Sequence, residues 1–253
     1  MFAPLKKGLY AYTKIYIKRE SPVLVYAPGR VGSMGLLKNL RDVGIFSFKV
    51  ESFKIERRGT TQFVKKHIIN KKKPAHIISL VRDPVAIMGS YYFSKCSNGW
   101  IPDGSRALEK NDIKRLIDIF IEQVLKTERL NSHLYWFENE FYKYTGIDVF
   151  EHMFDTDNMF GIVEHELYPT LIIRTELDNT KKAEVINTFL GVKNVTITRE
   201  NTRNKKDNAD LYARFMSQLH IPLNLLEKIY SSPYSQHFFS DAERESLKAK
   251  WLQ

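Results

Sequence analysis

The chain contains a single cysteine, Cys96, among its 253 residues. One thiol excludes an intramolecular disulfide and any zinc site built on a cysteine cluster, and it makes no demand for an oxidising compartment. The sequence also lacks any run of about eighteen apolar residues, which excludes an ordinary membrane-spanning helix. Residues 1–20 carry too many charges for a secretory signal. These absences predict a cytoplasmic protein, with the inner face of a membrane as the alternative location.

Positive charge is the strongest bias in the composition, with a net charge of +10 at pH 7. A cofactor with several phosphates, an anionic glycan, nucleic acid and a lipid surface would all favour such an excess, so charge does not choose among them. The sequence has no helix-turn-helix, RNP-like or zinc-finger pattern, which argues against nucleic acid as the main partner. The segment 1–20 mixes Leu, Tyr and Ile with Lys and Arg. We expect it to pack on the domain, with peripheral contact to an anionic membrane surface as the alternative.

Length and an apolar content of 43% predict a single globular domain over residues 1–253. Buried-strand patterns alternate with helical patterns, which is typical of an α/β fold, a three-layer sandwich with a central, mostly parallel sheet. The predicted strands are Val23–Ala27, Ile45–Glu51, His76–Val81, Met159–Glu164, Tyr168–Thr175 and Val195–Thr198. The predicted helices are Thr60–Asn70, Asp112–Leu130, Asn131–Tyr144, Asn179–Leu190 and Asp207–Leu219, and Cys96–Asn111 is predicted as a loop.

A turn suited to phosphate follows the first strand. The segment Pro28–Gly32 reverses the chain before a helical pattern begins near Ser33, and its glycines can take positive φ and let an anion approach the backbone. Arg30 adds a fixed charge with forked donors, and Ser33 can cap the helix and bond a phosphate oxygen. This pattern predicts a P-loop-like phosphate cradle; the alternative is a glycine-rich turn without a ligand. The Gly-Lys-Ser/Thr of a Walker A loop is absent, which argues against an ordinary NTPase.

A second strand, turn and helix occupy His76–Ser94. Arg82 follows the strand's carboxyl end, where open α/β sheets bind ligands, and Asp83 and Pro84 suit the start of a helix. Ser90 lies about two helical turns later. Two such units in one chain predict a ligand with two separate phosphates, although Arg-Asp-Pro is also a common strand exit.

The two motifs together resemble those of the PAPS-dependent sulfotransferases, which carry an Arg- or Lys-x-Gly-Ser/Thr loop and then Arg-Asp-Pro-x6-Ser. In that family the first loop binds the 5′-phosphosulfate end of 3′-phosphoadenosine-5′-phosphosulfate (PAPS), and the second segment binds the 3′-phosphate. Leu171–Leu177 and His237–Ser240 also resemble a branch of capsular polysaccharide synthesis proteins. The resemblance implies PAPS, or its product PAP, as co-substrate, no metal, and a carbohydrate or other hydroxyl compound as acceptor.

The same resemblance implies the residues of the cofactor site. An arginine stands where cytosolic members usually carry lysine, so the first loop keeps the charge but changes its geometry. A basic segment near the C-terminus can return over the 3′-phosphate, with a solvated loop as the alternative. The implied cofactor-binding residues are Arg30, Val31, Gly32, Ser33, Met34, Gly35, Arg82, Ser90 and Arg203.

Sulfuryl transfer needs an in-line acceptor oxygen, positive charge on the transferring group, here from Arg30, and a base for the hydroxyl proton. Glu51 ends the strand after the phosphate loop and resembles the glutamate of glycosaminoglycan sulfotransferases, so it is our first candidate base. Lys49 points to the same side of the strand and can hold Glu51 or the leaving phosphate; a simple strand-end ion pair is the alternative. His133 is the second candidate, because a near-neutral imidazole suits general-base work. Glu138 and Glu140 rank below it.

These residues predict a sulfotransferase that moves a sulfuryl group from PAPS to a hydroxyl of a carbohydrate or similar polar acceptor. Two alternatives stay open. One is a P-loop kinase-like nucleotide-binding protein, against which the missing Walker lysine argues. The other is a non-catalytic protein that binds PAP or an anionic glycan without turnover.

Overall fold

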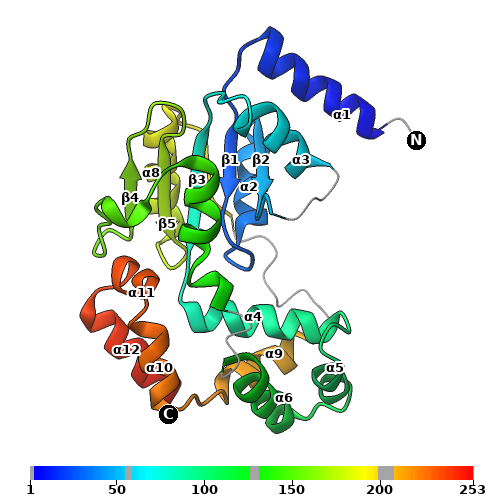
Figure 1. Cartoon of the computed structure of the whole chain (residues 1–253), viewed down its shortest axis with the longest axis vertical. Helices are drawn as coiled ribbons and strands as arrows, with labels where there is room; N and C mark the ends of the chain where they lie inside the picture. Colours follow the sequence, from blue (N-terminus) through cyan, green and yellow to red (C-terminus); the bar gives the residue numbers. More distant parts are fainter. Residues whose placement is uncertain (1–2, 55–58, 126–130, 199–207, 253) are drawn as a thin grey trace.

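The computed structural model describes residues 3–54, 59–125, 131–198 and 208–252. Five strands form one sheet in the order β2-β1-β3-β5-β4 (Figure 1). Strands β2, β1, β3 and β5 run parallel, and β4 is antiparallel to β5 at the edge. The predicted mixed α/β fold with a mostly parallel sheet is therefore confirmed. The strands are β1 (Val23–Tyr26), β2 (Ser47–Val50), β3 (His76–Val81), β4 (Phe160–Val163) and β5 (Thr170–Arg174).

Helices occupy most of the remaining described chain. Several are extended by short π-helical segments, and two 3₁₀ turns connect them. The α-helices are α1 (Ala3–Tyr12), α2 (Ser33–Asp42), α3 (Thr60–Val64), α4 (Pro84–Ser97), α5 (Pro102–Glu109), α6 (Ile113–Ile119), α7 (Lys143–Thr145), α8 (Asn179–Leu190), α9 (Ala209–Ser217), α10 (Leu223–Tyr230), α11 (Pro233–Phe238) and α12 (Asp241–Leu252). The other segments are η1 (Thr13–Ile17), η2 (Lys65–Ile69), η3 (Phe120–Leu125), η4 (Asn131–His133), η5 (Phe137–Tyr142) and η6 (Val149–Glu151).

Apolar side chains are buried on both faces of the sheet. Along β1 they alternate, with Leu24 and Tyr26 in one hydrophobic cluster and Val23 and Val25 in another. The first cluster also contains residues of η2, η5 and α11, and the second contains residues of α2 and α8. Strands this uniformly apolar are what a parallel sheet with both faces covered requires.

A third hydrophobic cluster lies beyond the carboxyl ends of the parallel strands, among α4, α5, α6, α9, α10 and α12 (Figure 1). Its centre includes Tyr92, Phe120 and Phe215, all buried and in ring contact with one another. Helix α4 starts directly after β3 and carries the chain into this cluster. The sequence pattern predicted a sandwich around the sheet and did not anticipate this separate helical core.

The segment Cys96–Asn111, which we predicted as a loop, is largely helical. Helix α4 continues to Ser97, and α5 occupies Pro102–Glu109 with its proline in the first turn. Gly104 of α5 is buried against α4, where an added Cβ would lie 2.4 Å from Cys96 Sγ. Close packing between the two helices, which local pattern does not reveal, stabilises α5.

The prediction of a strand at Val195–Thr198 is wrong. Its backbone is bound by side chains instead of by a neighbouring strand. Asn187 accepts from the Val195 N–H over 3.0 Å and donates to the Val195 carbonyl over 3.1 Å. Thr198 donates through its hydroxyl to Asn39 over 2.9 Å. Two amide side chains therefore take the place of a sheet ladder.

Within the described part of the chain, no helix combines the length and the apolar character needed to cross a bilayer.

Candidate functional site

Two loops meet at the carboxyl ends of the central strands. The chain passes from β1 to β2 on one side, while β3 borders β1 on the other side. Where the strands that follow a central strand lie on opposite sides of it, the loops at its carboxyl end diverge and leave a crevice at which α/β proteins bind ligands. Residues 27–32 follow β1 at this place, and residues 82–83 follow β3.

The first loop ends in an uncapped helix N-terminus. Gly32 occupies the N-cap position of α2 at φ 82°, and Arg30 has φ 72°. No side chain caps the helix, and its first turn carries no acidic residue. Our prediction that Ser33 caps the helix is therefore wrong, because Ser33 is already the first helical residue. The start of α2 presents backbone N–H groups and a positive dipole end without a side chain to neutralise them.

The Arg30 side chain reaches helix α4. Its guanidinium donates a short hydrogen bond to Ser94 Oγ. Ser90 lies one turn earlier on the same helix and is half-buried. The first phosphate motif thus lies against the helix that belongs to the second.

Arg82 is fixed by its backbone and reaches the first loop with its side chain. The Tyr234 hydroxyl accepts from the Arg82 N–H over 2.9 Å and donates to the Arg82 carbonyl over 2.8 Å. Arg82 Nη1 donates to the Arg30 carbonyl over 3.3 Å. Among the described residues, neither guanidinium has a carboxylate within ion-pair distance. Two half-buried arginines therefore meet here, and no carboxylate of the described chain neutralises their charges.

Glu51 lies beside the first loop. A Cβ placed on Gly29 would be 3.9 Å from the Glu51 carboxylate, an ordinary contact distance, so the carboxylate lies directly against this loop. Lys49 and Glu51 form an ion pair through a very short contact, on the same side of β2. The Trp136 indole donates to the Glu51 carbonyl over 2.9 Å and holds the end of the strand. The Glu51 side chain stays 45% exposed, which leaves one carboxylate edge open toward the crevice.

The other base candidates are less open. His133 is 7% exposed, and its ring packs edge-on against Tyr91, which follows Ser90 on α4. Glu140 is 3% exposed and accepts from the Tyr26 hydroxyl over 2.9 Å and from Ser52 Oγ over 2.9 Å. Those contacts give Glu140 a structural role, as the support of the chain after β2.

Glu138 is half-buried, and burial raises the pKa of its carboxyl. Its Oε2 is buried and accepts no hydrogen bond from any described residue. Burial therefore limits the access of a substrate hydroxyl to this carboxyl.

Asp83 anchors the second loop, and the sequence pattern identified only part of its role. It caps α4 as predicted, accepting from the Val85 N–H over 3.1 Å. The same carboxylate accepts from the Tyr230 hydroxyl over 2.7 Å and from the Trp251 indole over 3.1 Å. Burial raises the pKa of Asp83. The loop that carries Arg82 is thereby tied to the C-terminal helices α10 and α12. Tyr230 and Trp251 are too distant from Asp83 in sequence for a local pattern to indicate these contacts.

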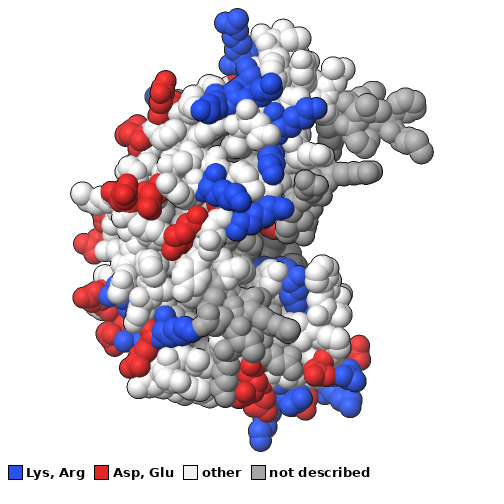
Figure 2. All heavy atoms as spheres, in the orientation of Figure 1, with Lys and Arg blue, Asp and Glu red and all other residues white. Residues whose placement is uncertain are grey.

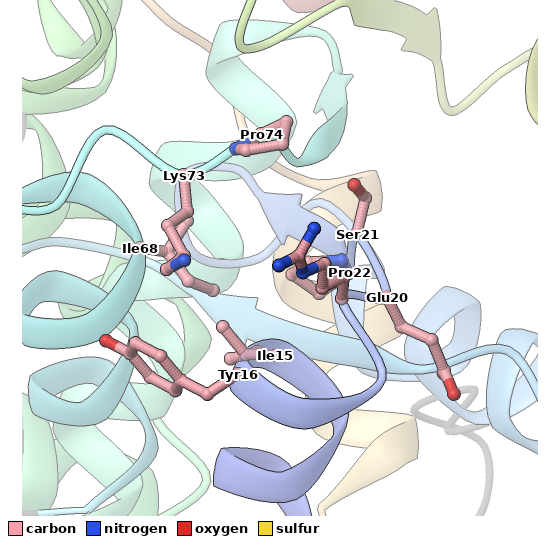
Figure 3. Close-up of a pocket in the computed structure, with 9 residues that line it drawn as sticks. Ile15, Tyr16, Glu20, Ser21, Pro22, Ile68, Lys73 and Pro74 are labelled. Atoms are coloured by element: carbon pink, nitrogen blue, oxygen red, sulfur yellow. The ribbon is translucent and has the colours of Figure 1, made fainter.

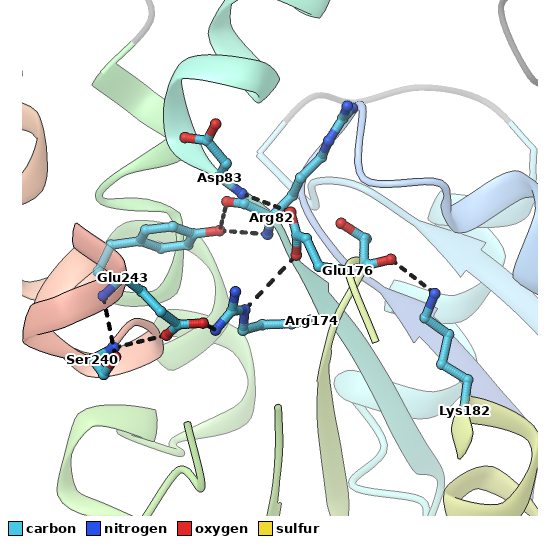
Figure 4. Close-up of polar contacts among 9 residues, drawn as sticks. Arg82, Asp83, Arg174, Glu176, Lys182, Ser240 and Glu243 are labelled. Atoms are coloured by element: carbon cyan, nitrogen blue, oxygen red, sulfur yellow. Dashed lines mark hydrogen bonds and ion pairs between the residues drawn. The ribbon is translucent and has the colours of Figure 1, made fainter. Parts of the chain in front are cut away.

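A polar network continues from this loop to strand β5 (Figure 4). Glu176 accepts from the Asp83 N–H over 3.3 Å, and its carboxylate lies 3.8 Å from Arg174 Nε. Arg174 is 4% exposed and donates to Glu243 of α12 over 2.6 Å. Both ion-pair partners of Arg174, Glu176 and Glu243, are carboxylates, so Arg174 is a structural residue. In this it differs from Arg30 and Arg82, which have no carboxylate partner among the described residues.

A cavity of about 530 Å³ adjoins the start of α2. Val31, Gly32 and Gly35 line one side, and Thr175 and Glu176 after β5 line the other. Three of the residues implied as cofactor contacts therefore border a single hollow, whereas Arg30, Arg82 and Ser90 do not line it. Met34 is 51% exposed. Arg203, another implied contact, lies outside the described residues.

The geometry defines a mixed α/β protein in which two loops, each carrying an arginine, meet at the switch point of the parallel strands. A sequence model for the NKWYS family, described as "putative capsular polysaccharide synthesis protein", matches residues 108–240, more than half of the chain. The chain belongs to this family. No curated protein and no solved structure matches it. The matched region contains His133, β4 and β5, and it begins after Arg30, Glu51, Arg82 and Ser90.

Proposed function

We propose that the protein is a PAPS-dependent sulfotransferase acting on a hydroxyl of a carbohydrate or similar polar acceptor. The observation that carries the proposal is the convergence of Arg30 and Arg82 at the carboxyl ends of β1 and β3, with no carboxylate partner among the described residues. Guanidinium groups without a carboxylate partner form strong, charge-assisted hydrogen bonds to phosphate, so two of them near one loop favour a ligand with two phosphate groups.

The residues of the crevice fit such a ligand. The backbone N–H groups at the start of α2, together with Arg30, would hold the 5′-phosphosulfate, and Arg82 with Ser90 would hold the 3′-phosphate. The cavity beside Gly32 and Gly35 adjoins the start of α2 and would receive part of the nucleoside. In this assignment Val31, Ser33 and Met34 contribute mainly through the backbone, and Arg203 would cover the 3′-phosphate.

PAPS supplies an activated sulfuryl group when it is bound. Glu51 accepts the proton of the acceptor hydroxyl as the new sulfur–oxygen bond forms, and the bond from sulfur to the bridging phosphate oxygen breaks. Arg30 and the α2 N–H groups stabilise the negative charge that develops on that oxygen. Lys49 orients the Glu51 carboxylate through their ion pair. His133 is the second candidate for the base.

The acceptor class is supported by the family. Its description refers to capsular polysaccharide synthesis, which favours a sugar hydroxyl over a phenol or steroid. An enzyme that sulfates a polysaccharide or its precursor would need a deep nucleotide site and an open acceptor side, and the exposed edge of Glu51 fits the second requirement.

Thermal unfolding of the full chain with PAP, AMP and ATP·Mg²⁺ tests the proposal. A ligand at a hundred times its Kd adds about 2.7 kcal/mol to the free energy of unfolding. We expect PAP to raise Tm far more than AMP, because only PAP carries a 3′-phosphate for Arg82. Equal shifts from PAP and AMP would refute the assignment, and a larger shift from ATP·Mg²⁺ would favour a kinase-like protein.

A further inference from the structure

The N-terminal helix has one face on the domain and another in solvent. Ala11 and Ile15 are buried against the sheet half of the molecule, as we predicted for a packed terminal segment. On the outer side, Leu9 is 69% and Ile17 is 72% exposed, and Tyr10 is 59% exposed. Leu9 and Ile17 are eight residues apart and share a helix face. Two aliphatic side chains and a tyrosine therefore project from one side of α1 and η1.

Cations surround this apolar face. Lys18 and Arg19 follow η1, and Lys66, Lys71 and Lys72 belong to or follow η2; all five side chains are exposed. None of them lies within ion-pair distance of a carboxylate of the described chain. Figure 2 shows Lys and Arg side chains gathered at the top of the molecule, over the ends of α1 and β1 in Figure 1.

Aromatic side chains of α1 and η1 contact η2, which carries part of these cations. The Tyr12 ring lies 6.0 Å from the His67 ring, and the Tyr16 hydroxyl is within 3.2 Å of His67 Nδ1. Burial lowers the pKa of His67, and the positive charges of Lys66 and Lys71 lower it further. Both ammonium groups therefore lie close to this aromatic group. Apolar and cationic side chains are thus adjacent.

A hollow of about 410 Å³ opens on the same side of the molecule (Figure 3). Tyr16, Arg19, Lys73, Pro22 and Pro74 line it, together with Glu20, whose carboxylate is paired with Lys14 over 2.6 Å. Lys73 Nζ lies 4.7 Å from the centre of the Tyr16 ring. Pro22 precedes β1 and Pro74 precedes β3, so the hollow is at the amino ends of the strands, opposite the candidate site.

We propose that this surface, formed by α1, η1 and the end of η2, docks on an anionic phospholipid bilayer. Leu9, Tyr10 and Ile17 enter the interface, the five exposed cations contact headgroups, and the hollow beside Lys73 accepts a headgroup phosphate. Nucleic acid or a soluble anionic glycan would satisfy the charges but would offer no apolar medium for Leu9 and Ile17. Because the candidate site is at the opposite end of the sheet, docking leaves it open to solvent.

Co-sedimentation of the full chain with vesicles tests the proposal. We expect binding to phosphatidylcholine vesicles that contain 30% phosphatidylglycerol, at least tenfold stronger than to pure phosphatidylcholine vesicles. The double variant Lys71→Gln/Lys72→Gln should bind the anionic vesicles about twenty-fivefold more weakly, from a factor of about five for each lysine. Leu9→Ser/Ile17→Ser should lower binding about tenfold or more, and this loss should persist at high salt.

Matched controls come from exposed residues elsewhere. Met153 is 88% exposed, and Lys110 and Lys114 are exposed near α5 and α6. Met153→Ser and Lys110→Gln/Lys114→Gln should bind as the wild type does, and circular dichroism checks that every variant is folded. Equal binding to neutral and anionic vesicles, or no loss in the Leu9→Ser/Ile17→Ser variant, would overturn the proposal. Binding to dextran sulfate that depends on Lys71 and Lys72 but not on Leu9 and Ile17, without vesicle binding, would identify the surface as a polyanion site instead.

Discussion

The Arg82 guanidinium donates a hydrogen bond to the main-chain carbonyl of Arg30, and this contact joins two loops that are 52 residues apart in sequence. Each loop follows a central parallel strand, so the contact lies at the switch point of the sheet. Arg82 is held independently by the Tyr234 hydroxyl, which bonds both its N–H and its carbonyl. The backbone of Arg82, and not its side chain, makes the contacts to Tyr234. The Arg82 side chain is therefore available to bind a ligand.

Substitution of Arg82 tests the 3′-phosphate site. Arg82→Ala should weaken PAP binding by about 1.5–3 kcal/mol, because it removes a charge-assisted bond to phosphate, whereas Ser90→Ala should cost about 1 kcal/mol. Titration calorimetry measures both. Arg214→Ala, at an exposed position on α9, is the control and should bind PAP as the wild type does. If Arg82→Ala also retains wild-type affinity, the two motifs do not form the site.

Substitution of Glu51 tests the catalytic base. Glu51→Gln should keep PAP affinity and fold, and should lower the rate of transfer on the order of a hundredfold or more, because the amide cannot accept the proton. His133→Ala removes a buried ring that packs on Tyr91, so its rate must be compared at equal folded fraction. Wild-type turnover by Glu51→Gln with an inactive His133→Ala would transfer the role to His133.

Asp83 should link stability to pH. Burial raises its pKa above the ordinary 3.8, so the folded state binds this proton more tightly than the unfolded state. That contribution to stability is full below the ordinary pKa and is lost as pH rises through the raised pKa. Asp83→Asn should cost about 1–3 kcal/mol, since its amide cannot satisfy all three donors, and the cost should shrink as pH rises. Urea unfolding between pH 4 and 8 measures it, with exposed Asp118→Asn as a control; a cost that grows with pH would contradict this account.

Gly104 should be essential for the contact between α4 and α5. Gly104→Ala places a methyl group 2.4 Å from Cys96 Sγ and 3.1 Å from the Tyr92 hydroxyl, so the helices must move apart. We expect a loss of about 1–3 kcal/mol in the free energy of unfolding, measured by urea titration. Gly8→Ala is the matched control, because nothing lies within 4 Å of its added Cβ. That variant should be neutral or slightly stabilising, and equal effects at the two sites would argue against tight packing at Gly104.

Local pattern was sufficient for the strands of the sheet and for the two strand–turn–helix segments. A largely apolar run before a turn predicted β1 and β3, and the proline after Asp83 predicted the start of α4. Lys49 and Glu51 share a side of β2 because side chains alternate along a strand. These features depend on residues within a few positions of one another, which is the range over which sequence periodicity carries information.

Long-range packing decided the rest. Helix α5 depends on the close fit of Gly104 against Cys96. Residues 195–198 do not form a strand, because the side chains of Asn187 and Asn39 take their hydrogen bonds. The carboxylate of Asp83 recruits Tyr230 and Trp251 from the end of the chain, and Arg30 turns toward Ser94 of a distant helix. Each of these contacts joins segments whose approach depends on the order of strands in the sheet. Strand order is set by the burial of whole helices against both sheet faces, an energy summed over the entire chain, and no single segment contains it.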